Sequence, residues 1–308
     1  MIRVQRLVAP VDFSDASRPG LERAVALADD FGAELHVLHV VPEPEVSVYP
    51  PFGVAADGER IQNAIREAHE KSFARVLESL PPSRARRVTE LRGGVGIAPT
   101  IVAYAEEVDA DLLLLGTHGH RGFRRFLLGS VTEEVVRRAP CPVLTHPPGH
   151  PSSPARSRRI LAAIDLSDQS RDVLRTAAAL ARGWDAELRV LHVVAPLALP
   201  GYHEAFFGTA AALDTAALEQ RSREVLDKLV AEASLPSTAQ VELAHGVTQH
   251  EIAAAAAHHQ CDLVVVASHG LSGLEHALLG STTARLLRRA QCPVLVLRAD
   301  GKDLTSAA

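Results

Sequence analysis

Apolar runs and amphipathic segments alternate along the whole chain, and the alternation occurs twice. Short runs such as 35–41 and 112–115 have the length and the aliphatic side chains of buried strands. Between such runs, apolar residues recur every three or four positions, which is the period of a helix with one buried face. The pattern predicts an α/β protein with two similar units, each a parallel sheet with helices on both faces.

The predicted elements of the two halves correspond one to one. In the first half we expect strands at 6–12, 32–41, 86–92, 112–115 and 142–145, and helices at about 17–31, 58–80, 97–108 and 130–139. In the second half we expect strands at 159–165, 185–194, 239–244, 263–266 and 293–297, with helices around 174–181 and at about 215–234, 249–259 and 281–290.

The two halves also share sequence. Residues 32–41 read Gly-Ala-Glu-Leu-His-Val-Leu-His-Val-Val, and residues 185–194 repeat this run with Asp and Arg at two positions. Self-similarity at a fixed period indicates a tandem repeat. We therefore expect domains at 1–147 and 158–299, a linker at 148–157 whose prolines exclude a helix, and a tail at 300–308.

A glycine-containing loop is the strongest candidate for chemistry. Gly116 ends an apolar run, Gly119 follows it, and Gly129-Ser130 opens a predicted helix. Glycine lets the backbone approach an anion closely and take a positive φ. The first N–H groups of a helix have no partner within the helix and favour negative charge. Ser130 with Glu133 has the spacing of a capping box. The loop is expected to bind phosphate.

The same spacing occurs in the second half, where Gly270 and Gly280-Ser281 follow the run 263–266. A single set of spaced glycines is weak support for a phosphate site. Two sets in matching context are strong support. The first strand of each half also ends at an acid, Asp12 or Asp165, followed by Ser residues that shape turns. Parallel sheets bind ligands at the carboxyl ends of their strands, so the acid and the loop are expected at one site.

Composition limits the classes of function. The chain has 308 residues and a net charge of −5, so nucleic acid is not expected as a main partner. No apolar run reaches the length of a membrane span, and the N-terminus lacks the pattern of a signal peptide, so we expect a cytoplasmic protein that does not bind membranes. Three cysteines cannot form a disulfide framework. Cys141 and Cys292 precede Pro-Val-Leu in the two halves and are expected to be small buried residues.

These motifs resemble those of the universal stress protein family. Residues of about 3–146 and 157–298 look like two tandem domains of this kind, and Gly116, Gly119, Gly129 and Ser130 fit the motif of its ATP-binding form. The resemblance implies a Rossmann-like five-stranded parallel sheet in each domain, with strand order 3-2-1-4-5. It also implies that the two halves pair as a pseudo-dimer through their fifth strands. Whether two chains form a homodimer stays open.

The resemblance further implies a bound adenine nucleotide. The cofactor would be ATP, with or without Mg²⁺ carried by its phosphates, and no protein residue is expected to bind a metal alone. In the first half the nucleotide-binding residues would be Val11, Asp12, Val40, Gly116, Gly119, Arg121, Gly129, Ser130 and Val131. In the second half they would be Ile164, Asp165, Val193, Gly270, Gly280, Ser281 and Thr282.

The two candidate sites differ in sequence. Ala267 stands where the motif has its first glycine, and its methyl group is expected either to narrow the ribose pocket or to exclude a positive φ. The first loop carries Arg121, Arg124 and Arg125, whereas the second has Glu275 among its residues. Because charge-assisted hydrogen bonds to phosphate are strong, the first half is expected to bind triphosphate more tightly.

Three functions are compatible with these features. The first is a nucleotide-dependent regulator of the stress response with no catalytic residues and little or no fast ATPase activity. The second is a slow ATP hydrolase, although the Gly-x4-Gly-Lys-Ser/Thr loop of fast ATPases is missing from the chain. The third is a scaffold that works without nucleotide. His39 and His192, on the second strands, are expected to be hydrogen-bonded structural residues.

Overall fold

The computed structural model describes residues 2–43, 55–117, 128–152, 155–195, 215–268, 279–299 and 301–305. The first half contains β1 (Arg6–Pro10), α1 (Arg18–Phe31), β2 (Glu34–Pro42), α2 (Ala55–Glu78), β3 (Arg87–Gly94), α3 (Ile97–Glu107), β4 (Leu112–Gly116), α4 (Ser130–Arg138) and β5 (Val143–His146). The second contains β6 (Arg159–Ile164), α5 (Ser170–Trp184), β7 (Glu187–Val194), α7 (Thr215–Glu232), β8 (Gln240–His245), α8 (Thr248–His258), β9 (Leu263–Ala267), α9 (Ser281–Leu287) and β10 (Val294–Leu297).

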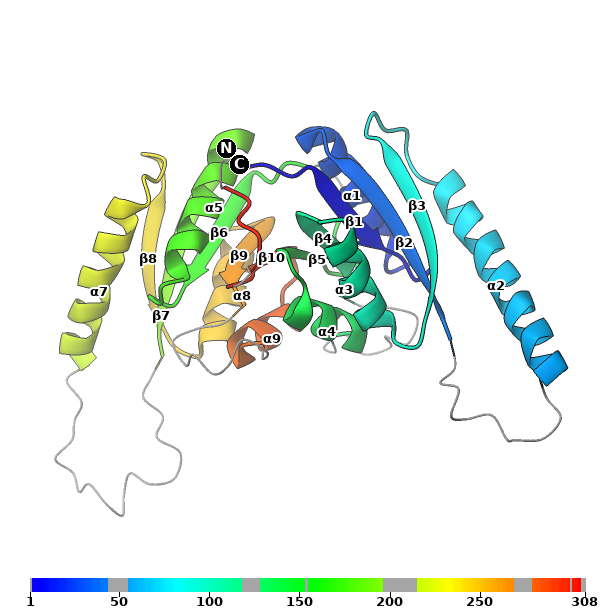
Figure 1. Cartoon of the computed structure of the whole chain (residues 1–308). Coiled ribbons are helices and arrows are strands. Elements are labelled where there is room, and N and C mark those ends of the chain that lie inside the picture. The colour runs from blue at the N-terminus through cyan, green and yellow to red at the C-terminus, as the bar shows by residue number, and fades with distance from the viewer. Residues whose placement is uncertain are drawn as a thin grey trace, which may run out of the picture.

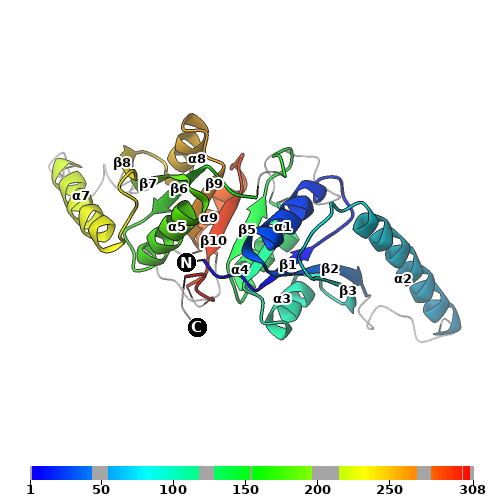
Figure 2. The ribbon, with the colours of Figure 1, turned by 90° about the horizontal axis from the view of Figure 1, so that it is seen from above.

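All ten of these strands form one sheet, in the order β3-β2-β1-β4-β5-β10-β9-β6-β7-β8. Within each half the strands are parallel and follow the order 3-2-1-4-5, as expected. The halves join where β5 and β10 pair antiparallel, with Leu144 opposite Leu295. Figure 2 shows these two strands side by side in the middle of the molecule. The expected pairing through the fifth strands is therefore confirmed.

Two hydrophobic clusters cover the two faces of this sheet, and both extend across the halves. One packs α1, α2, α5 and α7 on the first face. The other packs α3, α4, α8 and α9 on the opposite face. Figure 1 shows α2 and α7 at the two outer ends, beside the edge strands β3 and β8. Among the described residues, no helix is long and apolar enough to cross a membrane.

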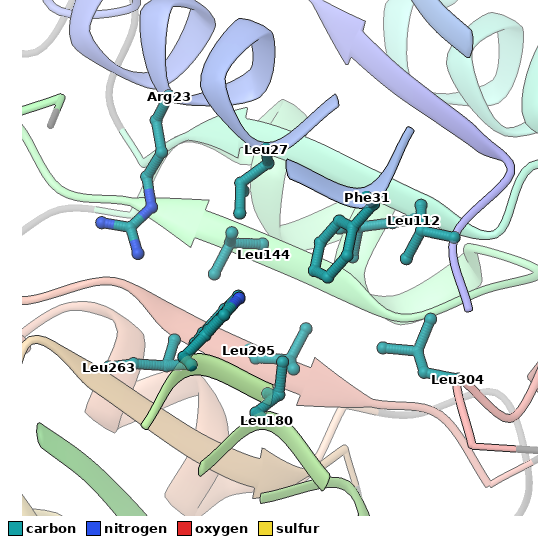
Figure 3. Close-up of a pocket in the computed structure, with 11 residues that line it drawn as sticks. Arg23, Leu27, Phe31, Leu112, Leu144, Leu180, Leu263, Leu295 and Leu304 are labelled. Atoms are coloured by element: carbon teal, nitrogen blue, oxygen red, sulfur yellow. The ribbon is translucent and has the colours of Figure 1, made fainter. Parts of the chain in front are cut away.

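A small cavity lies where the halves meet on the face of α1 and α5. Its volume is about 20 Å³, close to that of one water molecule. Figure 3 shows leucines of both halves around it, including Leu27 and Leu144 from the first half and Leu180 and Leu295 from the second. Most of the lining consists of repeat equivalents, namely Leu27 with Leu180, Phe31 with Trp184, Leu112 with Leu263 and Leu144 with Leu295, so the cavity marks the local twofold relation between the halves.

Contacts across this junction are not symmetric. The ring of Phe31 stacks on that of Trp184 with 6.0 Å between centroids. The guanidinium of the buried Arg23 donates to Ser157 Oγ at 3.0 Å, whereas the repeat equivalent of Arg23 is Thr176. The residues 301–305 of the tail return to the first half, where the Arg3 N–H donates to the Leu304 carbonyl at 2.9 Å.

Lys302 adds ion pairs to the contact between the tail and the first half. Its ammonium group lies 2.7 Å from Asp109 Oδ1 and 2.9 Å from Asp111 Oδ1. Asp111 also accepts hydrogen bonds from the N–H groups of Gln5 and of Arg6, the first residue of β1. The tail therefore connects the end of the second half to the beginning of β1 and β4 in the first.

The three cysteines are buried and unpaired. Burial raises the pKa of the Cys141 thiol to about 12, that of Cys261 to about 11 and that of Cys292 to about 12. A thiol with so high a pKa is a poor nucleophile. The interpretation of Cys141 and Cys292 as small buried residues is confirmed.

Candidate functional site

The turn after β1 places the Asp12 carboxylate at the carboxyl edge of the sheet. Asp12 Oδ1 accepts hydrogen bonds from the Ser14 N–H at 3.0 Å and from Ser14 Oγ at 2.7 Å. In the repeat, Asp165 Oδ1 accepts from the Ser167 N–H at 3.1 Å and from Ser167 Oγ at 2.6 Å. The sequence run Asp-x-Ser therefore forms the same turn twice.

The next residue of each turn has a strained backbone. Phe13 has a φ of 64° and Leu166 a φ of 66°. A bulky residue rarely takes this left-handed conformation, which costs on the order of 1 to 3 kcal/mol and concentrates at functional sites. This left-handed conformation turns the chain sharply immediately after the acid. The sequence reasoning missed this feature because neither position is glycine or asparagine.

The glycine loop is closed at its base by side-chain and backbone hydrogen bonds. Thr132 Oγ1 donates to the Gly116 carbonyl at 2.8 Å, and the Gly129 N–H donates to the Thr117 carbonyl at 2.9 Å. These bonds bring the end of β4 against the beginning of α4. The role of Thr132 was not predicted from the sequence, although the same residue type recurs at Thr283.

The second half repeats this closure despite its alanine. Thr283 Oγ1 donates to the Ala267 carbonyl at 2.9 Å, and the Gly280 N–H donates to the Ser268 carbonyl at 2.8 Å. Within the described residues, neither Gly116 nor Ala267 takes a positive φ, since both lie in strands. The expectation that a methyl group would exclude a required positive φ is therefore wrong. What remains different is the methyl group itself.

Gly129 is needed for close packing rather than for a left-handed conformation. It precedes the first turn of α4 in an extended conformation, with φ −61° and ψ 138°. A Cβ atom there would lie 3.3 Å from the Thr117 carbonyl oxygen and 3.7 Å from Thr132 Oγ1. The absence of a side chain leaves the N–H groups at the beginning of α4 accessible to an anion.

The capping box expected from Ser130 and Glu133 does not form. Gly129 is the N-cap of α4 and there is no side-chain cap hydrogen bond, so Ser130 is the first helical residue, and it is exposed. Glu133 Oε2 instead lies 3.0 Å from Arg288 Nη2 of the second half. A capping box requires the serine one position earlier. The N–H groups of the first turn thus keep no side-chain partner from a cap.

Apolar side chains line the same edge beside the acids. Val11 and Val40 of the first half and Ile164 and Val193 of the second are all buried at the carboxyl ends of the central strands or just beyond them. Val131 and Thr282, which follow the two loops, are partly exposed. Gly119, Arg121 and Gly270 lie outside the described residues, as do Arg124, Arg125 and Glu275. The other predicted site residues of each half lie at the carboxyl ends of the central strands, just beyond them, or at the beginning of α4 or α9.

A histidine on the second strand of each half is hydrogen-bonded at the carboxyl edge of the sheet. His39 Nδ1 is 2.7 Å from the Val11 carbonyl oxygen, and His192 Nδ1 is 3.0 Å from that of Ile164. Both histidines are buried. Burial, before any other cause, lowers the pKa of His39. Their interpretation as hydrogen-bonded structural residues is confirmed. Each contact joins the histidine to the residue that directly precedes the acid.

Comparisons with known proteins agree with this architecture. A sequence model of the Universal stress protein family matches residues 3–147 and 156–298. A universal stress protein of Methanocaldococcus jannaschii is 36% identical over 142 residues, which are 46% of this chain and 80% of that protein. A universal stress protein A homolog of Coxiella burnetii is 37% identical over 142 residues, covering 46% of this chain and 95% of its own length.

A solved structure extends the likeness to both halves together. The crystal structure of a universal stress protein from Archaeoglobus fulgidus has a TM-score of 0.64 and a sequence identity of 20%. The match covers 96% of this chain and 98% of that one. At this identity the likeness concerns the fold, including its tandem arrangement.

Proposed function

Because the chain belongs to the universal stress protein family, we propose that it is an ATP-binding regulator of the stress response in which the first half carries the tighter nucleotide site. The observation that carries the proposal is the closed loop base beside the Asp12 turn. Gly129 has no side chain where a Cβ would crowd the loop, and Asp12 lies at the same edge of the sheet. This combination suits a ribose next to a polyphosphate.

The residues divide by chemistry. The Asp12 carboxylate would accept hydrogen bonds from ribose hydroxyls, and Val11 and Val40 would contact the base. The exposed Ser130 hydroxyl and the backbone N–H groups that follow Gly129 would bind phosphate oxygens. In the second half, the same roles would be taken by Asp165, Ile164, Val193, Gly280, Ser281 and Thr282. The proposed set of nucleotide-binding residues also includes Gly116, Gly119, Arg121, Val131 and Gly270.

Regulation would follow from binding alone. A nucleotide at about 100 times its Kd stabilises the bound state by roughly 2.7 kcal/mol. That free energy is sufficient to change the population of a surface that a partner recognises. No fast chemical step is needed.

The proposal is tested by measuring bound nucleotide directly. Mass spectrometry of the denatured native preparation identifies any nucleotide that co-purifies. Isothermal titration of the emptied protein with ATP then gives the number of sites and their affinities. A Gly129→Val variant is expected to lose the tighter site, while Gly183→Ala, whose added Cβ would meet no atom within 4 Å, is the control. Absence of ATP binding to wild-type protein would exclude this function.

A nucleotide-independent scaffold is the second candidate, favoured by the continuous ten-stranded sheet. A scaffold would show the same melting temperature with and without ATP. Slow hydrolysis is the remaining alternative. Lys71 is paired with Glu67 and Lys302 with Asp109, so neither resembles a phosphate-binding lysine. Phosphate release at about 1 s⁻¹ or faster would favour an enzyme.

A further inference from the structure

Four rings pack together beneath the Asp12 turn in the first half. Phe13 stacks on His39 with 3.9 Å between centroids and an interplanar angle of 27°. His69 of α2 lies edge to edge with His39, with 4.9 Å between centroids, and its centroid is 6.1 Å from that of Phe13. Phe73, one turn further along α2, lies 6.1 Å from His39 and 6.2 Å from Phe13. We call Phe13, His39, His69 and Phe73 the ring cluster.

Hydrogen bonds fix the protonation pattern in this cluster. The Val11 carbonyl can only accept, so His39 must carry its proton on Nδ1. His39 Nε2 then has a lone pair, and it lies 2.6 Å from His69 Nδ1. In the neutral pair His69 donates from Nδ1 to His39. A chain of two hydrogen bonds thus runs from α2 to the backbone immediately before Asp12.

His69 is also where α2 begins to contact the body of the domain. Residues 60–68 of the helix are exposed, whereas His69 is partly buried and Phe73 is buried. The hydrogen bond from His69 to His39, beside the packed rings of Phe13 and Phe73, therefore links the protruding part of α2 to the Asp12 turn.

The second half provides a natural comparison. Its strand histidine, His192, keeps the contact with the Ile164 carbonyl. The repeat equivalents of Phe13, His69 and Phe73 are Leu166, Ser222 and Leu226. The turn is therefore present in both halves, and the ring cluster is confined to the first.

We propose that His69 and Phe13 are positioning residues for the nucleotide site of the first half, acting through His39 on the Val11 carbonyl and the Asp12 carboxylate. The inference rests on the proposed ATP function of that site. Neither residue needs to contact nucleotide. Phe13, in the strained turn, packs against the His39 imidazole, and His69 of α2 is hydrogen-bonded to that imidazole. Together the two contacts fix the position of His39 relative to the turn.

The arrangement makes the first site sensitive to acid. The groups that face His39 are the Val11 carbonyl, the Asp12 carboxylate, His69, Phe13 and Phe73. With one proton added to the pair, His69 can still donate from Nδ1 to His39 Nε2, so the hydrogen bond between them survives. A second proton places two N–H groups face to face, and the pair must separate. Nucleotide affinity of the first site is therefore expected to fall as the pH decreases.

The test uses full-length protein and titrates one site at a time with ATP. Asp165→Ala weakens the second site and Asp12→Ala the first, so each background reports mainly on the other site. In the Asp165→Ala background, His69→Ala is expected to weaken ATP binding about fivefold near pH 7.5, the loss of about one hydrogen bond. His69→Asn restores the affinity because its amide replaces the donor and can also turn its oxygen towards protonated His39. Ser222→Ala in the Asp12→Ala background is the matched control and should change nothing.

The pH profile separates positioning from mere packing. Between about pH 7.5 and 5.5 the first site should lose about fivefold more affinity than the second, most of it below about pH 6.5 because burial lowers the pKa of His39. The second site corrects for titration of ATP itself. His69→Asn should remove that excess. Phe13→Leu, which copies the second half, should weaken the first site while keeping the fold, as checked by circular dichroism.

The outcomes distinguish the two proposals. Equal ATP affinity of wild type, His69→Ala and Phe13→Leu at both pH values would overturn this inference alone. Failure of the wild-type first site to bind ATP would overturn the proposed function and this inference with it. If His69→Ala does not fold, His69→Asn decides the matter, because unchanged excess pH sensitivity in that variant contradicts the role assigned to His69.

Discussion

The two halves repeat the same turns and loop closures but support them with different side chains. In the first half, four rings pack beneath Asp12, whereas near Asp165 only His192 is kept and the other three positions hold Leu166, Ser222 and Leu226. Ser170 Oγ donates to Asp165 at 3.2 Å, while the equivalent Ser17 Oγ donates to the Ser14 carbonyl at 2.9 Å. The backbone framework is thus insensitive to these exchanges, and differences in ligand affinity are expected to come from the side chains.

The largest expected difference concerns His146 at the end of β5, whose repeat equivalent is Leu297. Burial, and then the nearby charge of Arg23, lower the pKa of His146 to about 4. Its Nδ1 is buried without a hydrogen-bond partner. The folded protein therefore keeps a neutral imidazole while the unfolded chain takes up a proton as the pH decreases from about 6.5 to 4. The contribution of His146 to the free energy of unfolding is therefore fully present above pH 6.5, and about 3 kcal/mol of it is lost as the pH decreases towards 4.

His146→Leu copies the second half and should remove that loss. Urea unfolding of wild type and variant at about pH 7.5 and 4.5 gives the difference in pH dependence, in which titration of other groups cancels. A loss of stability on acidification that is equal in the two proteins would show that His146 does not titrate as described.

The next comparison is between the two acids. Removing a carboxylate that accepts charge-assisted hydrogen bonds costs about 2 kcal/mol, so Asp12→Ala should weaken the tighter ATP site about thirtyfold. Asp165→Ala should leave that site unchanged and affect only the weaker one. Isothermal titration of both variants measures the effect. Equal residual affinity in the two variants would contradict the ranking of the halves.

Much of this comparison could be predicted from the sequence. The alternation of apolar runs and helical periods was sufficient for the order of the elements, the duplication and the parallel sheets, whereas the strand order within each sheet was implied by the family resemblance. The strained Phe13, the loop closure by Thr132 and the ring cluster could not be predicted, since they depend on contacts between residues far apart in the chain. The capping box at Ser130 failed for a local reason: the helix begins one residue earlier than the motif requires.

The tail offers a third comparison, because it runs from the second half to the first and has no symmetric equivalent. Lys302→Ala removes the contacts with Asp109 and Asp111 and should lower the free energy of unfolding by about 1 kcal/mol, the upper range for a partly exposed ion pair. Lys228→Ala, an exposed lysine on α7, is the control and should have no effect. Denaturant unfolding measures both. An equal effect of the two substitutions would mean that the tail does not stabilise the junction.

The smallest expected effect tests the one departure from the glycine motif. Ala267 keeps the strand conformation and the hydrogen bond from Thr283 that Gly116 has with Thr132, so its backbone already fits the site. Ala267→Gly therefore gains only the space of one methyl group and should strengthen ATP binding to the second half about threefold, less than about 1 kcal/mol. Gly116→Ala should weaken the first site by a similar factor. If the two substitutions leave both affinities unchanged, the methyl group does not reach the nucleotide, and the difference between the halves must arise from the loop charges and the ring cluster.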